Sequence, residues 1–133
     1  MMELGRSYKS FKRIDKSAYT SSLGAFDINV YVDGDVGAYR KIHPETTGTG
    51  ATTLAVGTLI VREVFDANGQ VSKLTLMAKG PSGYDPRIGD WWWGEADPAG
   101  NPTKLGRLTE CHGCHLPRAT DDYLFGVPRE DQR

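Results

Sequence analysis

The sequence has few cysteines and no long apolar run, and each shortage excludes a class of protein. Its 133 residues include two cysteines, which lie three positions apart, so no disulfide framework links distant elements. No apolar stretch approaches the ~18 residues that a membrane-spanning helix needs. Lys and Arg total 16 against 17 for Asp and Glu, a formal net charge of −1. We therefore expect no membrane span and no nucleic-acid partner.

The length fits one turn-rich domain. A chain of 133 residues lies within the ~100–200 residues of a typical domain with one core. Its 16 glycines and 38% hydrophobic residues are typical of a domain rich in turns. We expect a single domain over 1–133, with loose termini at 1–7 and 129–133.

Apolar periodicity predicts an antiparallel sheet. Apolar and polar residues alternate over 26–32, which indicates a half-buried strand. Strands over 58–65 and 71–77 are joined by Asp-Ala-Asn-Gly, whose Asn-Gly pair accepts the positive φ of a tight hairpin turn. A further strand begins at the run of three tryptophans, in which Trp91 and Trp93 share one face and the middle ring takes the other.

Short helices are expected beside these strands. Apolar residues at helical spacing predict one over 8–15. Asp35 caps a second that runs to Ile42, with Tyr39 and Ile42 packed inward. A third over 105–114 would place both cysteines one turn apart. The expected fold class is therefore α+β, mainly antiparallel β-sheet with a few short helices.

The two cysteines belong to a Cys-His-Gly-Cys-His run at 111–115, the Cys-x-x-Cys-His pattern of covalent haem attachment. Cys111 and Cys114 can each add to one vinyl group of the same haem, and His115 then reaches the iron. A thiol–disulfide pair or half of a zinc site are the alternatives. Zinc lacks partners, because His43 is the only histidine outside the run, and a redox pair normally follows a strand in a βαβ unit. We expect haem c.

The other face of the iron has only weak candidate ligands. His43 abuts a proline in a polar turn, His112 lies inside the motif, and Met77 ends a strand as an ordinary core residue does. The simplest interpretation leaves one iron position open. An open position favours ligand binding or catalysis over electron transfer through a six-coordinate haem.

Haem is normally attached to this motif outside the cytoplasm. Residues 1–6 have neither the charged start nor the apolar stretch of a secretory signal. We therefore expect a periplasmic or otherwise exported protein whose signal segment is missing from this sequence.

Charged residues near the predicted strands are the other candidates for chemistry. Arg62 shares a strand face with Ile60 and Val64, so it either donates hydrogen bonds to a haem propionate or iron-bound ligand, or forms a salt bridge. Glu95 and Asp97 either move protons or belong to a solvated strand end. The tryptophans either line a haem pocket or fill the core.

The order of these features resembles the cytochrome P-460 family over about residues 8–127. An Asn-Val-Tyr-Val strand is followed by Gly-Thr-Leu-Ile-Val-Arg-Glu-Val, by the 77–93 stretch, by the haem motif and by Thr-Asp-Asp-Tyr-Leu-Phe. Ordinary cytochromes c carry the haem motif near the N-terminus instead. The resemblance implies a mainly antiparallel β fold that encloses a five-coordinate haem c, often in a homodimer.

The resemblance also implies two activities. Family members with a cross-linked haem oxidise hydroxylamine, with nitric oxide chemistry, whereas the related cytochromes c prime beta bind nitric oxide without the cross-link. Aligning 57–64 with the family's Gly-Thr-x-x-Val-Lys-Glu pattern puts Arg62 where the cross-linking lysine would be, and neither Lys73 nor Lys79 occupies that place. A guanidinium stays protonated and is no ready nucleophile. The loop at 46–53 also looks longer than the family's usual turn.

These observations leave two main hypotheses. The first is a haem protein that binds a small gaseous or nitrogen-oxide ligand, such as nitric oxide, with Arg62 near the ligand. The second is an oxidoreductase acting on hydroxylamine or peroxide, in which Arg62 assists charge development and Glu95 handles protons. A redox partner protein and a second copy of the chain are further expected partners.

Overall fold

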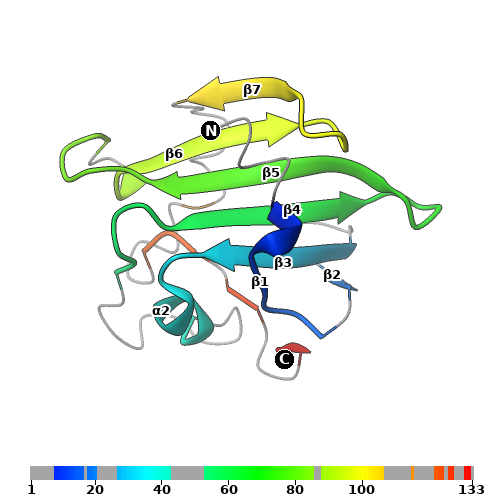
Figure 1. The fold of residues 1–133 in the computed structure, drawn as a ribbon, viewed down its shortest axis with the longest axis horizontal. Coiled ribbons are helices and arrows are strands. Elements are labelled where there is room, and N and C mark those ends of the chain that lie inside the picture. The colour runs from blue at the N-terminus through cyan, green and yellow to red at the C-terminus, as the bar shows by residue number, and fades with distance from the viewer. Residues whose placement is uncertain are drawn as a thin grey trace.

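The structure, a computed structural model, describes residues 8–16, 18–20, 27–42, 53–85, 88–106, 115, 122–124, 126–127 and 131–132. In chain order its elements are η1 (Tyr8–Ser10), β1 (Lys12–Arg13), β2 (Tyr19–Thr20), β3 (Asp27–Asp33), α2 (Val36–Arg40), β4 (Leu59–Phe65), β5 (Val71–Lys79), β6 (Trp91–Ala96) and β7 (Pro102–Gly106). Strands dominate the described part of the chain (Figure 1). No helix among these residues has the length and apolar character needed to cross a membrane.

The strands form one antiparallel sheet. Within the described residues seven strands take part, in the order β1-β3-β4-β5-β6-β7, with β2 also paired to β3. From β3 to β7 each strand pairs with the next one along the chain, so the sheet is a meander (Figure 1). The prediction of a mainly antiparallel β fold with few helices is confirmed.

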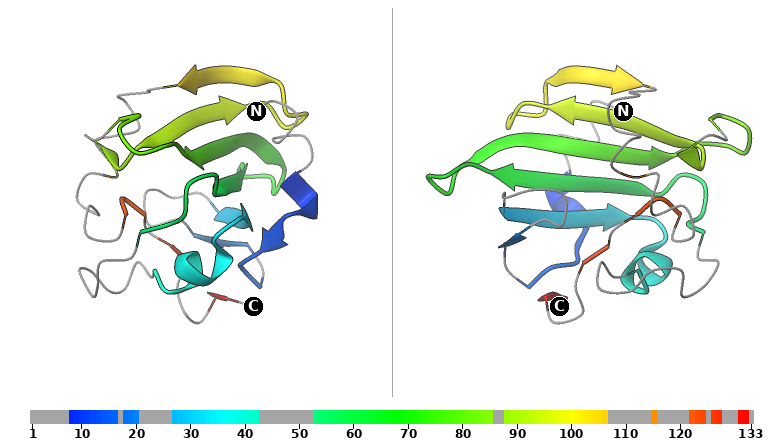
Figure 2. Two further views of the ribbon diagram at one scale, coloured as in Figure 1. Left: turned by 60° about the vertical axis from the view of Figure 1, so that its left-hand side comes forward. Right: turned by 180° about the vertical axis from the view of Figure 1, so that it is seen from behind.

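Both faces of the central strands are buried. Ile60 and Val64 of β4 belong to a core cluster with Tyr39 of α2 and with Leu124 and Val127, whereas Val61 belongs to a second cluster under η1. Figure 2, left, shows η1 and the orange-red C-terminal segment on opposite sides of the sheet. The sheet is therefore the middle layer, with the larger core on the face that carries α2.

The prediction of a half-buried strand over 26–32 is right in position but wrong in burial. Asn29 and Tyr31 were expected to face water, yet they are only 7% and 8% exposed. The cause is η1, whose Tyr8 packs edge-on against Tyr31 with ring centroids 5.1 Å apart. A sequence alternation cannot reveal that a segment from elsewhere covers the polar face.

Two helix predictions need correction. Helical geometry covers only Tyr8–Ser10 of the 8–15 prediction, because the chain then turns to pair with β3, where Ile14 N donates to Val30 O at 2.9 Å. Residues 105 and 106, expected to begin a helix, end strand β7 instead. Residues 107–114 of that prediction, like residues 46–52 of the loop noted at 46–53, lie outside the described residues.

Local signals at α2 and the hairpin are confirmed. Asp35 caps α2 by accepting a hydrogen bond from Ala38 N at 3.2 Å, and Tyr39 and Ile42 are buried as expected. Strands β4 and β5 form the predicted hairpin, and Gly69 in its turn has a φ of 77°. Near the C-terminus, Gln132 Nε2 donates to backbone oxygens of Arg40 and Val127.

A buried carboxylate ties η1 to the sheet. Glu63 accepts hydrogen bonds from Tyr8 Oη, from Asn29 Nδ2 at 3.0 Å and from Tyr31 Oη at 3.3 Å. Burial alone would raise the pKa of Glu63, but hydrogen bonds from Asn29 and Tyr8 and a nearby lysine charge outweigh it and lower the pKa. Burial and the Glu63 carboxylate together raise the pKa of Tyr8 and of Tyr31. The carboxylate is therefore stabilised in its charged form.

Glu63→Gln is expected to lower the free energy of unfolding by about 1–3 kcal/mol near neutral pH, because the buried donors lose a charged acceptor. A depressed folded-state pKa stabilises the fold above the unfolded value of about 4.3, and this contribution is lost as pH falls through the lower folded value. Urea unfolding measured from about pH 7 to pH 3 should therefore show that the free energy of unfolding falls more steeply with acidification in the unmodified protein than in Glu63→Gln. Equal pH dependence in both proteins would contradict this assignment.

Candidate functional site

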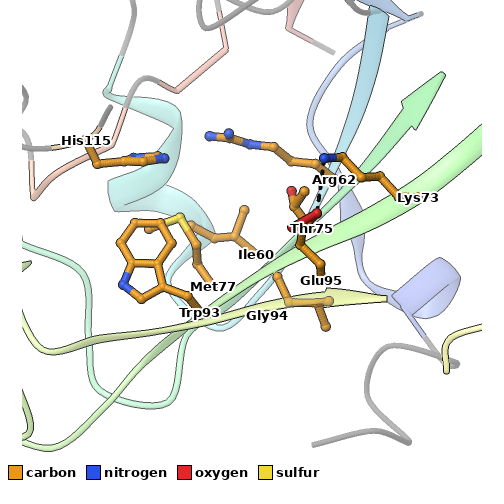
Figure 3. A pocket seen from close by; sticks show the side chains of 10 residues that line it. Ile60, Arg62, Lys73, Thr75, Met77, Trp93, Gly94, Glu95 and His115 are labelled. Atoms are coloured by element: carbon orange, nitrogen blue, oxygen red, sulfur yellow. Dashed lines mark hydrogen bonds and ion pairs between the residues drawn. The ribbon is translucent and has the colours of Figure 1, made fainter. Parts of the chain in front are cut away.

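One face of the sheet carries a cavity of about 260 Å³. Nine of its described lining residues come from three adjacent strands, β4, β5 and β6, and the tenth is His115 from the C-terminal part of the chain (Figure 3). They are Ile60, Arg62, Lys73, Thr75, Leu76, Met77, Trp93, Gly94, Glu95 and His115. The volume lies just below the range of ~300–1,000 Å³ common for small-molecule sites. The cavity thus joins the sheet to the segment that contains the haem motif.

His115 is held in one orientation and one tautomer. The residue is 5% exposed, and its ring packs against Trp93 with centroids 4.7 Å apart. Its Nδ1 lies 2.6 Å from the backbone oxygen of Tyr123. Because a carbonyl oxygen can only accept, this contact assigns a proton to Nδ1, and in the neutral ring the lone pair is then on Nε2. This is the form in which histidine binds metals, with the second nitrogen bonded to a backbone carbonyl.

Arg62 reaches the same cavity from β4. Figure 3 shows the Arg62 guanidinium and the His115 ring pointing toward each other. Arg62 Nε is buried and has no hydrogen-bond partner within the described residues, and no carboxylate among them forms an ion pair with Arg62. The strand face that Arg62 was predicted to share with Ile60 and Val64 is therefore the face that borders the cavity.

Tyr39, a fully buried residue of α2, is close enough to Arg62 to feel its charge. Its hydroxyl is buried and has no hydrogen bond of good geometry within the described part of the chain, with the Arg62 side chain as its nearest charged neighbour. Burial raises the pKa of Tyr39, and the positive charge and hydrogen-bonding capacity of the nearby Arg62 oppose that rise only in part. Tyr39 therefore stays a neutral hydroxyl beside the guanidinium.

Two strand-end carboxylates have different roles. Glu95 lines the cavity and forms ion pairs with Lys73 at 3.1 Å and with Lys104 at 3.7 Å (Figure 3 shows the first). The Lys73 side chain is 48% exposed, so this end of the cavity lies near solvent. Asp97 instead closes the turn after β6, where hydrogen bonds from Asn101 and other turn amides lower its pKa. Of the two roles considered for Asp97, proton transfer or a place in a solvated strand end, the structure therefore supports the second.

The three tryptophans were expected either to line a pocket or to fill the core, and the structure shows both roles. Trp93 both lines the cavity and belongs to the main core cluster. Trp91 is fully buried in that cluster, and Trp92 packs against the cluster on the opposite face. Met77, paired with Trp93 across β5 and β6, is 5% exposed, so it is a core residue that also borders the cavity.

Some predicted site residues are not placed. Cys111 and Cys114, like His43 and His112, lie outside the described residues. The cavity also includes Thr75, which was not among the residues predicted from the sequence. The alternation Lys73, Thr75, Met77 in β5 is the signal that would have found it, because residues two apart share a face.

Comparison with known proteins gives one family match. A family model described as Cytochrome P460 matches residues 6–126, a span that includes every described strand and His115. No sequence among the curated proteins matches the chain. The match therefore covers both the sheet that lines the cavity and the segment that completes it.

Proposed function

Because this chain belongs to the cytochrome P460 family and is therefore a haem protein, we propose that it carries a covalent haem c and binds small ligands such as nitric oxide at an open iron position. One observation carries the proposal. A buried histidine directly after the second cysteine of the motif has its Nδ1 bonded to a backbone carbonyl and lines a cavity.

The residues around the cavity fit this group. Cys111 and Cys114 would hold the haem through two thioethers, and His115 would ligate the iron through Nε2. Trp93 and Met77 supply an apolar wall, while Arg62 supplies a donor suited to an anionic or polar oxygen. When bound, the haem would supply an iron centre whose ligand binding and redox behaviour depend on its axial histidine.

Arg62 is the proposed ligand-side residue. It lines the cavity and its guanidinium points toward His115, so the N–H groups at the end of this side chain are placed to donate to a ligand bound there (Figure 3). A guanidinium stays protonated, so Arg62 binds and orients without forming a bond to the haem. We therefore propose two thioethers and no third cross-link.

The alternative is an oxidoreductase that acts on hydroxylamine or peroxide. Glu95 lines the cavity but is paired with Lys73 and Lys104, which makes it a weak proton carrier as the structure stands. Anaerobic titration of the ferrous protein with nitric oxide tests the binding proposal, which expects a high-spin starting spectrum and saturation at one ligand per haem. Sustained reduction of an electron acceptor by hydroxylamine would overturn the binding-only function.

Arg62→Leu is expected to raise the dissociation rate of a polar or anionic iron ligand by roughly tenfold to a hundredfold, the equivalent of one charge-assisted hydrogen bond of about 1.5–3 kcal/mol. Stopped-flow displacement of the ligand measures this rate. Lys104→Met is the matched control, because it removes an exposed cation that does not line the cavity. Equal rates in Arg62→Leu and the unmodified protein would contradict a ligand contact.

We further propose, from the nature of haem attachment, that the protein works in the periplasm or another exported location. The family resemblance supports a homodimer and, for the enzymatic alternative, a redox partner protein. Size measurement in solution separates monomer from dimer without any assumption about activity.

A further inference from the structure

A second charged cluster lies close to His115 but outside the cavity lining. Lys79, at the end of β5, is 7% exposed, and its Nζ donates to Asp122 Oδ1 at 2.7 Å and to Gly89 O at 2.7 Å. The same ammonium lies 5.0 Å from the centroid of the Trp91 ring. A buried cation with these partners fixes two separate backbone segments to the end of the sheet.

Both carboxylate oxygens and the backbone oxygen of Asp122 accept hydrogen bonds. Its Oδ2 accepts a hydrogen bond from Leu54 N at 2.9 Å, and its backbone oxygen accepts one from Trp91 Nε1 at 2.9 Å. Asp122 and Tyr123 have φ values of 54° and 63°, a left-handed conformation that costs non-glycine residues free energy. The contacts of Asp122 therefore impose this turn on the chain.

The turn presents the acceptor of His115. The Tyr123 backbone oxygen, one residue after Asp122, receives the hydrogen bond from His115 Nδ1. On the other side, Gly89 presses against the Tyr123 ring so closely that an added Cβ would lie 2.7 Å from it. The Lys79 ammonium donates to Gly89 O and to Asp122 Oδ1. One cation therefore fixes both the residue that precedes Tyr123 in the chain and the glycine that packs against its ring.

We propose that the buried Lys79–Asp122 ion pair is a positioning device that holds the Tyr123 carbonyl against His115 and so sets the strength of His115 as an iron ligand. The inference rests on the proposed function, because it takes His115 as the ligand. A hydrogen bond from Nδ1–H to an acceptor makes Nε2 a stronger donor to a metal. Neither Lys79 nor Asp122 lines the cavity, so both act through Tyr123 and not by contact with a ligand bound at the iron.

The test uses the haem-loaded protein with Lys79→Met. Losing the ammonium should loosen the turn, weaken the His115–Tyr123 hydrogen bond and reduce the donor strength of Nε2. The ferrous iron–histidine stretching frequency, measured by resonance Raman spectroscopy, should fall, and the midpoint potential should rise, because a weaker donor stabilises the oxidised iron less. Lys79→Arg keeps a cation, and we expect its frequency to lie closer to the unmodified value.

Glu63→Gln is the matched control, since it disturbs a buried carboxylate on the opposite face of the sheet. It should lower thermal stability yet leave the iron–histidine frequency and the potential unchanged. A Lys79→Met protein that loses stability but keeps both values would overturn the positioning role and leave the proposed function standing. Absence of an iron–histidine band in the unmodified protein would instead overturn the proposed function.

Discussion

His115→Ala is expected to abolish the five-coordinate ferrous spectrum while leaving the haem attached to the chain. The two functions of the motif are separable, because the cysteine sulfurs make the covalent bonds and the imidazole ligates the iron. Removing the axial histidine itself should cost more than the roughly 10–100-fold in metal affinity or activity that is typical of losing only its hydrogen-bond partner. Absorption spectra of the ferrous protein, with and without added imidazole, measure the effect.

Added imidazole should restore part of the spectrum, because the substitution leaves space beside Trp93 where the buried ring lay. His112→Ala is the matched control, since it changes the other histidine of the same motif and should leave the spectrum unaltered. A His115→Ala protein that keeps the original spectrum, or an equal effect from His112→Ala, would contradict the assignment of the ligand.

Gly126→Ala is expected to give the largest loss of stability among single substitutions to alanine at the glycines of the described chain. Gly126 has a φ of 72°, and an added Cβ would lie 2.5 Å from the carbonyl carbon of Ile42 and closer still to its oxygen. A backbone group cannot move aside as the end of a flexible side chain can. The cost should exceed about 3 kcal/mol, because overpacking and an unfavourable φ add together.

Gly69→Ala is the control for Gly126→Ala in urea unfolding. Its φ of 77° is nearly the same, but nothing lies within 4 Å of the added Cβ. It should therefore show only the conformational cost of about 1–2 kcal/mol. Similar losses in both variants would mean that the close approach at Ile42 is unimportant. A larger loss at Gly126 would show that the segment after Tyr123 is fastened to the end of α2.

Features with a short-range cause could be predicted from the sequence. The Asn-Gly turn between β4 and β5 and the Asp35 cap of α2 each depend on a few neighbouring residues. Alternation in a strand likewise placed Arg62 on the face of Ile60 and put Trp91 and Trp93 together. These predictions hold because backbone sterics and side-chain period act within one element.

Features that depend on distant contacts were missed. The segment after Ser10 has helical spacing, but pairing with β3 satisfies its backbone better than an isolated short helix would. The polar face of β3 is buried because η1 covers it. The acceptor for His115 is a backbone oxygen of Tyr123, which has no side-chain signature, and its position depends on Lys79 from another element.

The central claim is a haem held covalently at 111–115, and acid extraction combined with intact mass measurement tests it most directly. The protein is produced with haem-attachment machinery, extracted with acidified organic solvent and weighed. We predict that the haem stays with the polypeptide, that the mass equals the chain plus one haem, and that haem peptides contain Cys111 and Cys114 but not Arg62. Haem recovered in the organic phase, with a bare polypeptide left behind, would contradict the account.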